Sequence, residues 1–363
     1  MDKKIFFIIN TLQGGGAERV VSTLAKRLHE LKYEVSIVCL NSTQSVYPLP
    51  ADLEIIHLLN RKGDSYSQRI YYAVQIFIKL SYLLFTNRPN CIISFMTTAN
   101  LWTGVSSFFT RATYIVSERT TPDHTIHQFH KVLQWLSGFV YKNAKVIVVP
   151  SKGIEDCLRK NSNFKKLNNF KVISNPINHL RNAAVVQKVN NGKFILGVGR
   201  LSYEKGFDQL ITAFKNAHLP KEIQLLIIGE GPEEENLVQQ IKILNLQGRV
   251  KLLGFKNDVH HYYAQAEMFV LPSRNEGYPN ALIEAMSFGC ACIAMDCQFG
   301  PSEIIQHQHN GLLIADKNVY ALSEAINLLH TNTLLKEKLA LNAKLINITN
   351  SLDRITSQWE AII

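Results

Sequence analysis

Short apolar runs alternate with helix-like stretches along the whole chain, and this alternation constrains the fold more than any other feature. The runs of the first half are Lys4–Asn10, Glu34–Leu40, Cys91–Phe95, Tyr114–Ser117, Val146–Pro150 and Phe170–Ser174. The pattern restarts at Phe194–Gly199, Gln224–Gly229, Val250–Gly254, Met268–Pro272 and Cys290–Asp296. Such runs are typical of strands buried on both faces of a parallel sheet, and repeated strand–helix units imply right-handed crossovers. We therefore predict an α/β fold with two doubly wound, Rossmann-like domains.

Two domains are also expected from the length of 363 residues, which exceeds what one hydrophobic core normally organises. The polar, weakly patterned stretch 177–192 is interpreted as a linker between a first domain, 1–176, and a second domain, 193–346. In doubly wound sheets, ligands bind beyond the carboxyl ends of the strands. The predicted site is therefore a cleft across which the two domains face each other.

The excess positive charge is confined to the first half. Residues 1–176 hold 22 Lys and Arg against 11 Asp and Glu, whereas the remaining residues hold 17 against 18. This asymmetry indicates either a solvated basic surface or an anionic partner. Nucleic acid is not favoured as that partner, because the chain contains no zinc finger, RNA-recognition signature or basic helix with repeated anchors.

The segment from Arg69 to Arg88 favours an anionic membrane surface as the partner. Between these two arginines the sequence is apolar over most of its predicted helical circumference. No stretch of the chain reaches the roughly 18 uninterrupted apolar residues that a spanning helix needs. The segment is therefore either a buried helix or one partly immersed in a bilayer interface, where each nearby basic residue adds about 1 kcal/mol with anionic lipid.

Cysteine usage and the first residues are typical of a cytoplasmic protein. The six cysteines form no CxxC pair, which predicts reduced thiols, and Met1-Asp-Lys-Lys leads straight into a strand without a small-residue cleavage site. Cys290, Cys292 and Cys297 form either a metal cluster or a set of packed thiols, and their apolar neighbours favour packed thiols.

A glycine-rich loop, Thr11–Arg19, joins the first strand to its helix. Gly15 and Gly16 allow close approach to the backbone, and the helix N-terminus presents N–H groups suited to a phosphate. The loop is not a good dinucleotide fingerprint, because Arg19 stands where the third glycine would fall and the second strand ends without an acid for a ribose. The alternative is a simple tight turn.

A second loop, Gly199–Gly206, follows the first strand of the second domain and carries Arg200 and Lys205. Arginine offers a planar fork for a diphosphate, and lysine offers a mobile point charge. Two such cations can stabilise a leaving diphosphate without a metal. The alternative is an ordinary pair of surface charges.

The most specific motif is Pro272–Gly289, which places Glu276 on a loop and Glu284 early in a predicted helix, Ala281–Phe288. Glu284 is expected to accept from vicinal ribose hydroxyls, and Glu276 from sugar hydroxyls ahead of the helix. The alternative is that both acids only complement the helix end.

The start of the same helix is expected to bind phosphate. Asn280 is predicted to cap the helix, which leaves the backbone N–H groups of Ala281 and Leu282 for a phosphate.

Together these motifs resemble the nucleotide-sugar-dependent glycosyltransferases of family 4, which have the GT-B fold and retain the anomeric configuration. The resemblance covers essentially the whole chain and extends to Gly229-Glu-Gly231, Gly254-Phe255 and Gly300-Pro-Ser-Glu303. It is closest to bacterial members that extend lipid-linked oligosaccharides, lipopolysaccharide or capsule repeats. It also implies that the segment 347–363, with its helix from Ser351 to Ile363, packs back on the first domain.

The resemblance implies specific roles for the motif residues. Arg200, Lys205 and Glu276 would carry catalysis, with the two cations on the donor diphosphate and Glu276 on the donor sugar. The remaining donor-binding residues would be Gly15 and Gly16 beside the phosphate, Glu230 and Phe255 near the base, Glu284 on the ribose, and Asn280, Ala281 and Leu282 at the helix start.

The resemblance breaks on the loop after Tyr114–Ser117, where many relatives carry Ser-Glu-His and this chain has Ser117-Glu118-Arg119. Glu118, Arg119 and His124 are nevertheless the expected acceptor-side residues. His124, His127 and His130 are spaced three apart, a pattern that fits either zinc or an acceptor-side or surface role. No carboxylate or cysteine is seen to complete a metal set, so no metal is predicted.

The sequence thus predicts a retaining glycosyltransferase that moves a hexosyl or N-acetylhexosaminyl group from a nucleoside diphosphate sugar, with UDP preferred by resemblance. The expected acceptor is a lipid-linked oligosaccharide or a lipopolysaccharide or capsule glycan. No metal or other cofactor is expected, and the protein is expected at the inner face of the cytoplasmic membrane. The alternatives are a UDP-sugar 2-epimerase or a phosphorylase on the same fold, or a non-catalytic partner of a membrane assembly.

Overall fold

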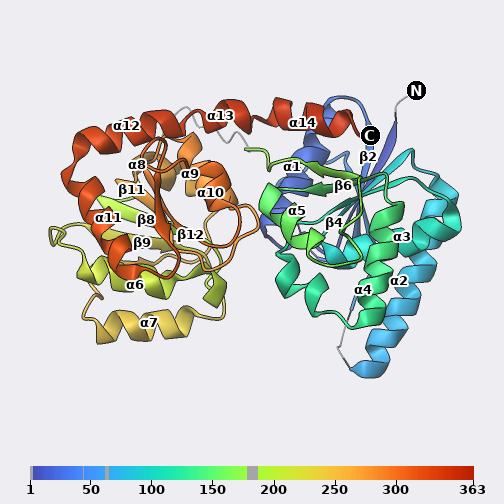
Figure 1. Cartoon of the computed structure of the whole chain (residues 1–363), viewed down its shortest axis with the longest axis horizontal. Helices are drawn as coiled ribbons and strands as arrows, with labels where there is room; N and C mark the ends of the chain where they lie inside the picture. The colour runs from blue at the N-terminus through green and yellow to red at the C-terminus, as the bar shows by residue number, and fades with distance from the viewer. Residues whose placement is uncertain (1–2, 44, 62–64, 178–186) are drawn as a thin grey trace. The chain divides into compact units, whose positions relative to one another are not determined.

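The computed structural model describes residues 3–43, 45–61, 65–177 and 187–363, so most of the predicted linker 177–192 lies outside the described residues. The chain divides into two compact units (Figure 1). The first unit is Met1–Pro176 together with Leu352–Ile363, and the second is Ile177–Ser351.

The first unit is built on a seven-stranded parallel sheet in the order β3-β2-β1-β4-β5-β6-β7. Phe7 on β1 pairs in register with Ile37 of β2 on one side and Ile93 of β4 on the other. The strands are β1 (Lys4–Ile9), β2 (Glu34–Asn41), β3 (Glu54–Leu59), β4 (Cys91–Phe95), β5 (Tyr114–Ser117), β6 (Val146–Val149) and β7 (Phe170–Val172). The sequence pattern missed β3, which lies at the sheet edge and exposes Glu54 and His57.

The second unit holds a six-stranded parallel sheet in the order β10-β9-β8-β11-β12-β13. Its strands are β8 (Phe194–Val198), β9 (Gln224–Ile228), β10 (Val250–Leu252), β11 (Met268–Leu271), β12 (Cys292–Asp296) and β13 (Leu312–Ala315). The order of strands reverses at β8 and β11, which makes the carboxyl ends of these strands the expected ligand position in such a sheet.

Helices separate the strands in both units (Figure 1). The first unit has α1 (Gly16–Glu30), α2 (Tyr66–Asn87), α3 (Thr97–Thr110), η1 (Pro122–His124), η2 (Ile126–Gln128), α4 (Lys131–Asn143), α5 (Lys152–Arg159) and α14 (Leu352–Glu360). The second has η3 (Tyr203–Lys205), α6 (Phe207–Asn216), α7 (Glu234–Ile243), α8 (Val259–Gln265), α9 (Asn280–Ser287), α10 (Pro301–Ile304), α11 (Val319–Thr331), α12 (Thr333–Ala343) and α13 (Ile346–Thr349). None of the described helices is long and apolar enough to cross a membrane.

The closing helix α14 packs on the first unit through its apolar side chains. Trp359 is fully buried and stacks on Phe95 with ring centroids 5.7 Å apart, and Ile355 and Ile362 join the same core. The second unit extends through α13 to Ser351, beyond the expected boundary at residue 346, because α13 contacts α9.

The six cysteines are all buried free thiols. Burial raises the pKa of Cys290 to about 12 and that of Cys297 to about 12, so both thiols stay protonated at neutral pH. Cys290 and Cys292 belong to the apolar core of the second unit, beside β11 and β12.

Candidate functional site

The loop after β8 is fixed by close backbone packing against the loop after β9. A Cβ on Gly229 would lie 1.9 Å from the carbonyl oxygen of Gly199, and one on Gly231 would lie 2.3 Å from that of Leu201. The backbone N–H of Leu201 donates to the carbonyl of Glu230 at 2.9 Å. Only glycine permits this approach, so the two loops pack together as one rigid segment at the carboxyl ends of β8 and β9.

Lys205, at the end of the loop after β8, contacts Glu276, which lies on the loop after β11. The Lys205 ammonium donates to Glu276 Oε1 at 2.7 Å, and the Ser273 hydroxyl donates to the same oxygen at 2.7 Å. Glu276 is 7% exposed, so its carboxylate is held by a cation and a hydroxyl with little help from water. An ammonium has three donors, and the remaining N–H groups of Lys205 are available to a ligand oxygen.

Arg200 lies on the same loop with a different environment. Its side chain is exposed, and within the described part of the chain it makes no hydrogen bond. Its charge and that of Lys205 help to lower the pKa of Glu204, after the larger effects of hydrogen bonds from the Glu204 backbone and the Ser202 side chain. The loop therefore presents one cation held by an ion pair and one exposed cation, an arrangement that can bind a diphosphate.

The helix α9 starts one residue earlier than predicted, and Asn280 does not cap it. Pro279 is the N-cap residue and Asn280 is the first helical residue, with no side-chain capping bond. The Leu282 N–H donates to the Pro279 carbonyl at 3.2 Å, so the expectation that it is left for a phosphate is wrong. The N–H of Ala281 meets no acceptor among the described residues.

Glu284 is nearly buried on α9 and accepts a hydrogen bond from the Tyr263 hydroxyl at 3.2 Å. Tyr263, on α8, was not predicted from sequence, because its position gives no motif signal. One carboxylate oxygen is thus oriented by a protein donor, which suits a group that accepts from a ligand hydroxyl with its other lone pairs.

The two residues expected near the base are brought together. Glu230 Oε1 accepts from the Phe255 N–H at 3.2 Å, and Gly229 and Gly254 form an isolated antiparallel bridge beneath them. The Phe255 ring is half-exposed, so an aromatic face is available next to the loop.

In the first unit, the side chains of Tyr47 and Glu18 lie against the glycine-rich loop. The Gly15 N–H donates to the Tyr47 hydroxyl at 3.1 Å, and the same hydroxyl donates to the Gly15 carbonyl at 2.9 Å. A Cβ on Gly15 would lie 2.4 Å from Glu18 Oε2, and burial raises the pKa of that carboxyl. The Gly15 N–H is therefore not free for a phosphate, contrary to expectation, whereas exposed Gly16 opens α1.

Glu118 is an anchor of its loop and not an acceptor contact. It is fully buried and accepts from the hydroxyls of Thr97, Thr120 and Tyr141 at 2.9, 2.6 and 2.6 Å. These bonds satisfy the carboxylate inside the unit, which corrects the acceptor-side role predicted for Glu118.

Arg119 also points into the first unit, where its Nε donates to the Ser117 hydroxyl at 2.7 Å and its Nη1 donates to Asn175. The guanidinium lies 5.1 Å from the Phe95 ring and 5.8 Å from the Trp359 ring. Burial lowers its pKa, and Glu118 opposes that effect. The Arg119 guanidinium therefore contacts the closing helix through Trp359, while its acceptor-side role stays a prediction, and the side chain of His124 lies outside the described residues.

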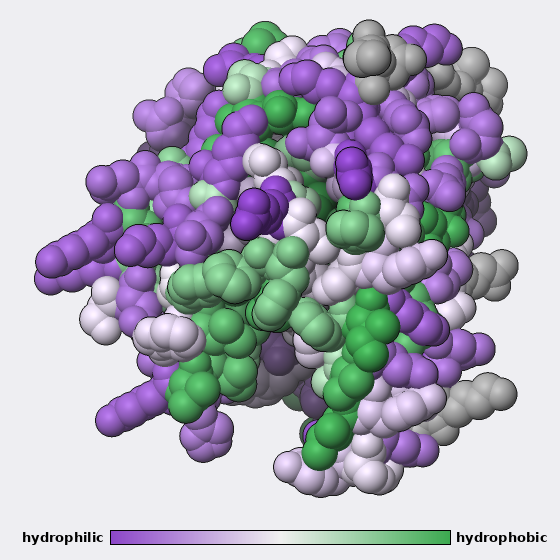
Figure 2. Space-filling model, turned by 90° about the vertical axis from the view of Figure 1, so that its right-hand side faces the viewer, coloured by the Kyte–Doolittle hydropathy of each residue, from purple (hydrophilic) through white to green (hydrophobic). Residues whose placement is uncertain are grey.

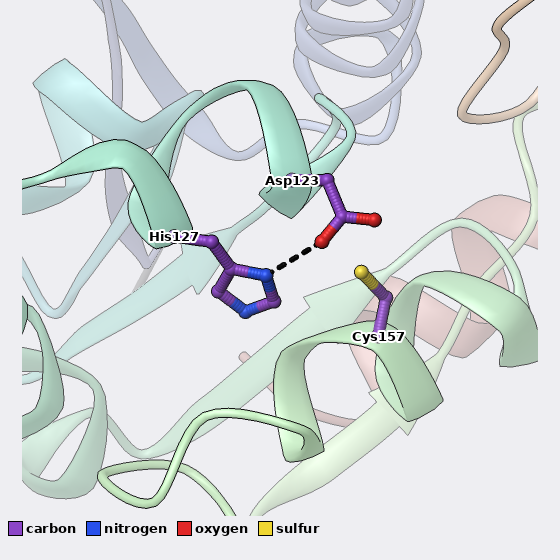
Figure 3. Close-up of side chains that lie close together, drawn as sticks. All are labelled: Asp123, His127 and Cys157. Carbon is purple, nitrogen blue, oxygen red and sulfur yellow. Dashed lines mark hydrogen bonds and ion pairs between the residues drawn. The ribbon is translucent and has the colours of Figure 1, made fainter.

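A carboxylate and a cysteine do join one of the three spaced histidines, contrary to the sequence analysis (Figure 3). His127 Nδ1 and Asp123 Oδ1 are 2.7 Å apart, and the Cys157 thiol lies against Asp123. The three ligand atoms lie within 4.8 Å of one another, and their types suit zinc.

The same three side chains also contact one another without a metal. Burial first, and then the Asp123 charge, raises the pKa of the Cys157 thiol to about 11 when no ion is bound. The Asp123 carboxylate contacts both His127 and Cys157, and these contacts link the η1–η2 loop to α5.

Comparison with known proteins agrees with this architecture. A family model described as Glycosyltransferase Family 4 matches residues 14–181, and one described as Glycosyl transferases group 1 matches residues 180–346. A GalNAc-transferase of Campylobacter jejuni, named as acting on N-acetylgalactosamine-N,N'-diacetylbacillosaminyl-diphospho-undecaprenol, is 30% identical over 89% of each chain. The amylovoran biosynthesis glycosyltransferase AmsD of Erwinia amylovora is 29% identical over 90% of this chain and 92% of its own.

Solved structures share the fold at lower identity. Anabaena HepE in complex with UDP-glucose aligns with a TM-score of 0.80 at 20% identity, over 99% of this chain and 98% of its own. The lipopolysaccharide outer core galactosyltransferase WaaB aligns with a TM-score of 0.73 at 19% identity, over the same shares. The chain belongs to glycosyltransferase family 4 and is a retaining glycosyltransferase with the GT-B fold.

Proposed function

We propose that this enzyme transfers a hexosyl or N-acetylhexosaminyl group from a UDP-sugar to a lipid-linked oligosaccharide, or to a lipopolysaccharide or capsule glycan. The observation that carries the donor assignment is the pair formed by Lys205 and Glu276 at 2.7 Å, with the exposed cation of Arg200 on the same loop as Lys205. The acceptor class is supported by the relative of Campylobacter jejuni, whose name specifies an undecaprenol-linked glycan.

In the proposed reaction the bond between the sugar C1 and the diphosphate oxygen breaks while the acceptor oxygen bonds to C1 on the same face. The acceptor proton passes to the departing diphosphate oxygen. Arg200 and Lys205 stabilise the negative charge that grows on this oxygen, and Glu276 orients both Lys205 and the sugar. Glu284 holds the ribose, Phe255 and Glu230 lie by the base, and the Ala281 N–H adds one phosphate donor.

A donor panel tests this function. The full-length protein is incubated with UDP-, GDP- and ADP-linked hexoses and N-acetylhexosamines, with and without an undecaprenyl diphosphate-linked disaccharide, and products are identified by mass spectrometry and anomeric NMR. The proposal requires a product with retained configuration that forms only with acceptor. Conversion of the nucleotide sugar without acceptor would instead support an epimerase, and a requirement for free phosphate would support a phosphorylase.

Metal independence is expected because Arg200 and Lys205 supply the charge that a divalent ion would supply. Transfer rates measured in excess chelator should stay within about twofold of the untreated rate. Strict dependence on added Mn²⁺ or Mg²⁺ would contradict the two-cation arrangement.

The first unit carries an exposed apolar surface that supports binding of the enzyme to a membrane. Its exposed side chains, here called the α2–α4 face, are Ile70, Tyr71, Val74, Ile78, Tyr82, Phe85, Phe108, Phe109, Val132, Leu133 and Trp135. Ring contacts join the three helices, with Phe77 5.4 Å from Phe109 and Phe108 5.6 Å from Phe139. Figure 2 shows apolar side chains gathered across this side of the molecule.

Basic side chains border the α2–α4 face, and they include exposed Arg69, Arg88, Arg111 and Lys131. Aromatic and aliphatic groups bordered by cations are the composition of a surface that enters the interface of an anionic bilayer. Such a surface would bring the enzyme to an acceptor whose lipid is anchored in that bilayer.

Replacing Ile78 and Trp135, which are 59% and 63% exposed, by glutamate should weaken binding to vesicles containing anionic phospholipid by about 10-fold or more. The rate on a water-soluble acceptor should not change. Leu334→Glu is the matched control, because Leu334 is 82% exposed on the second unit and lies outside the face. Equal vesicle binding by the face variant and the control would contradict this part of the proposal.

A further inference from the structure

Arg274 makes several of the contacts between the loop carrying Arg200 and Lys205 and the loop carrying Glu276. It follows β11, while Arg200 and Lys205 follow β8, and these strands are neighbours in the sheet. The Arg274 N–H donates to the Glu204 carbonyl at 2.8 Å, and its guanidinium Nη1 donates to the Tyr203 carbonyl at 2.8 Å. Both acceptors lie in η3, the short turn that ends at Lys205.

The Arg274 guanidinium is also held from the other side. It forms a two-point ion pair with Asp208, whose Oδ1 accepts from Nη1 at 2.7 Å and whose Oδ2 accepts from Nη2. Its central carbon lies 4.2 Å from the centroid of the Tyr203 ring. The Arg274 side chain is 14% exposed, so little water competes for these bonds. Planar, bidentate contact of this kind is a property of arginine that lysine does not reproduce.

The turn at Lys205 has a second point of contact with the same strand end. Gly206 has a φ of 66°, and a Cβ there would lie 2.1 Å from the Pro272 carbonyl oxygen. Gln209 also donates to this carbonyl at 3.2 Å. Pro272 and Arg274 therefore fix the turn on both sides of Lys205, and the 2.7 Å contact to Glu276 follows from that placement.

We propose that Arg274, paired with Asp208, is a positioning residue that holds Lys205 and Glu276 in the geometry needed to stabilise the departing diphosphate. Arg274 does not touch the substrate in this assignment. It acts on the turn through its side chain, because loss of the guanidinium frees the Tyr203 carbonyl and the Asp208 carboxylate and lets the ammonium of Lys205 move, whereas the backbone N–H groups of Arg274 and Asn275 still donate to the Glu204 carbonyl. The proposal rests on the roles proposed above for Lys205 and Glu276.

The expected signature is a loss of kcat with little change in the donor KM. A displacement of about 1 Å can lower turnover by up to about 100-fold, so Arg274→Gln should lower kcat by about 10-fold or more. Arg274→Lys keeps the positive charge but loses the two-point contact of the guanidinium with Asp208, so its kcat should lie between those of Arg274→Gln and the wild type. Asp208→Asn should reproduce the effect of Arg274→Gln, and the double variant should be no slower than either single variant.

Arg249 offers a matched control within the same unit. It also donates to backbone carbonyls, those of Ile223 and Pro220 at 3.2 and 3.0 Å, and its guanidinium lies 4.7 Å from the Phe214 ring. It precedes β10 and, among the described residues, makes no contact with the Gly199–Gly206 loop. Arg249→Gln should lower the melting temperature as Arg274→Gln does but leave kcat unchanged.

The experiment measures kcat, donor KM and melting temperature for the wild type, Arg274→Gln, Arg274→Lys, Asp208→Asn and Arg249→Gln. It also measures Lys205→Ala in the wild-type and Arg274→Gln backgrounds. The fold-decrease in kcat caused by Lys205→Ala should be smaller in the Arg274→Gln background. Equal kcat for Arg274→Gln and Arg249→Gln, or full additivity with Lys205→Ala, would overturn the positioning role. If instead Lys205→Ala leaves the wild-type rate unchanged, the proposed function of Lys205 itself has failed.

Discussion

Replacing Arg200 or Lys205 by alanine is expected to lower kcat by about 100-fold or more, because each removes a cation from the oxygen that becomes negative as the glycosidic bond breaks. The effect should fall on kcat more than on the donor KM, since the charge grows only in the transition state. Steady-state rates with saturating acceptor measure it. Lys215→Ala, on the exposed end of α6, serves as the control for loss of a nearby positive charge.

The two variants should differ in stability, which separates their structural and chemical effects. The Arg200 side chain is exposed and makes no hydrogen bond within the described residues, so Arg200→Ala should unfold at the wild-type temperature. Lys205→Ala leaves the carboxylate of Glu276 buried with the Ser273 hydroxyl, and it should unfold earlier. Wild-type turnover by both variants, at full folding, would remove the proposed mechanism.

Gly229→Ala is expected to destabilise the second unit by about 3 kcal/mol or more. Gly229 has a φ of 143°, and the added Cβ would lie 1.9 Å from the Gly199 carbonyl oxygen, which is backbone and cannot swing aside. Relief requires the loops after β8 and β9 to separate, and this displaces Arg200 and Glu230. Chemical denaturation and donor titration should therefore show lost stability and lost donor binding together.

Gly248→Ala is the matched control for this substitution, because no heavy atom lies within 4 Å of the position that its Cβ would take. It should change stability by no more than about 1 kcal/mol. Equal stability for the two variants would show that the loops after β8 and β9 are not packed as described.

The central strands could be predicted from the sequence because both of their faces are buried. Cys91–Phe95 and Tyr114–Ser117 match β4 and β5 without error, and both are apolar runs bounded by polar residues. The strands β3 and β13 were missed: exposed Glu54 and His57 interrupt the apolar run of the edge strand β3, whereas β13 is an apolar run of only four residues that the sequence pattern did not separate from its surroundings. An edge strand needs no continuous apolar pattern, because it has a neighbouring strand on one side only and its other side faces solvent.

The site was predictable where its residues follow strand ends within one motif. Arg200, Lys205 and Glu276 were identified in this way, and the structure brings Lys205 to Glu276. The direction of a side chain depends on distant partners, so Glu118 was misassigned and the inward contacts of Arg119 were not foreseen. Tyr141, which donates to Glu118, lies 23 residues further along the chain. Trp359, which the Arg119 guanidinium contacts, lies near the end of the chain.

Arg274 shows what a motif can conceal. It lies between two residues that the sequence analysis used, yet only the structure reveals that it bonds to the Tyr203 and Glu204 carbonyls. Cys157 was missed for a related reason, because it reaches Asp123 and His127 from a separate segment, whereas Asp123 lies only four residues before His127 and was overlooked beside the three histidines. A spacing rule along one helix does not detect such a cluster.

Titration of the enzyme with uridine, UMP and UDP, with the guanosine series in parallel, tests the central claim most directly. The claim is that Arg200 and Lys205 bind the diphosphate of the donor. Isothermal calorimetry of the wild type should show about 100-fold tighter binding of UDP than of UMP, the gain that charge-assisted contacts to one more phosphate provide. The Arg200→Ala/Lys205→Ala double variant should lose that gain while its affinity for uridine is unchanged. An undiminished preference for UDP in the double variant would contradict the claim.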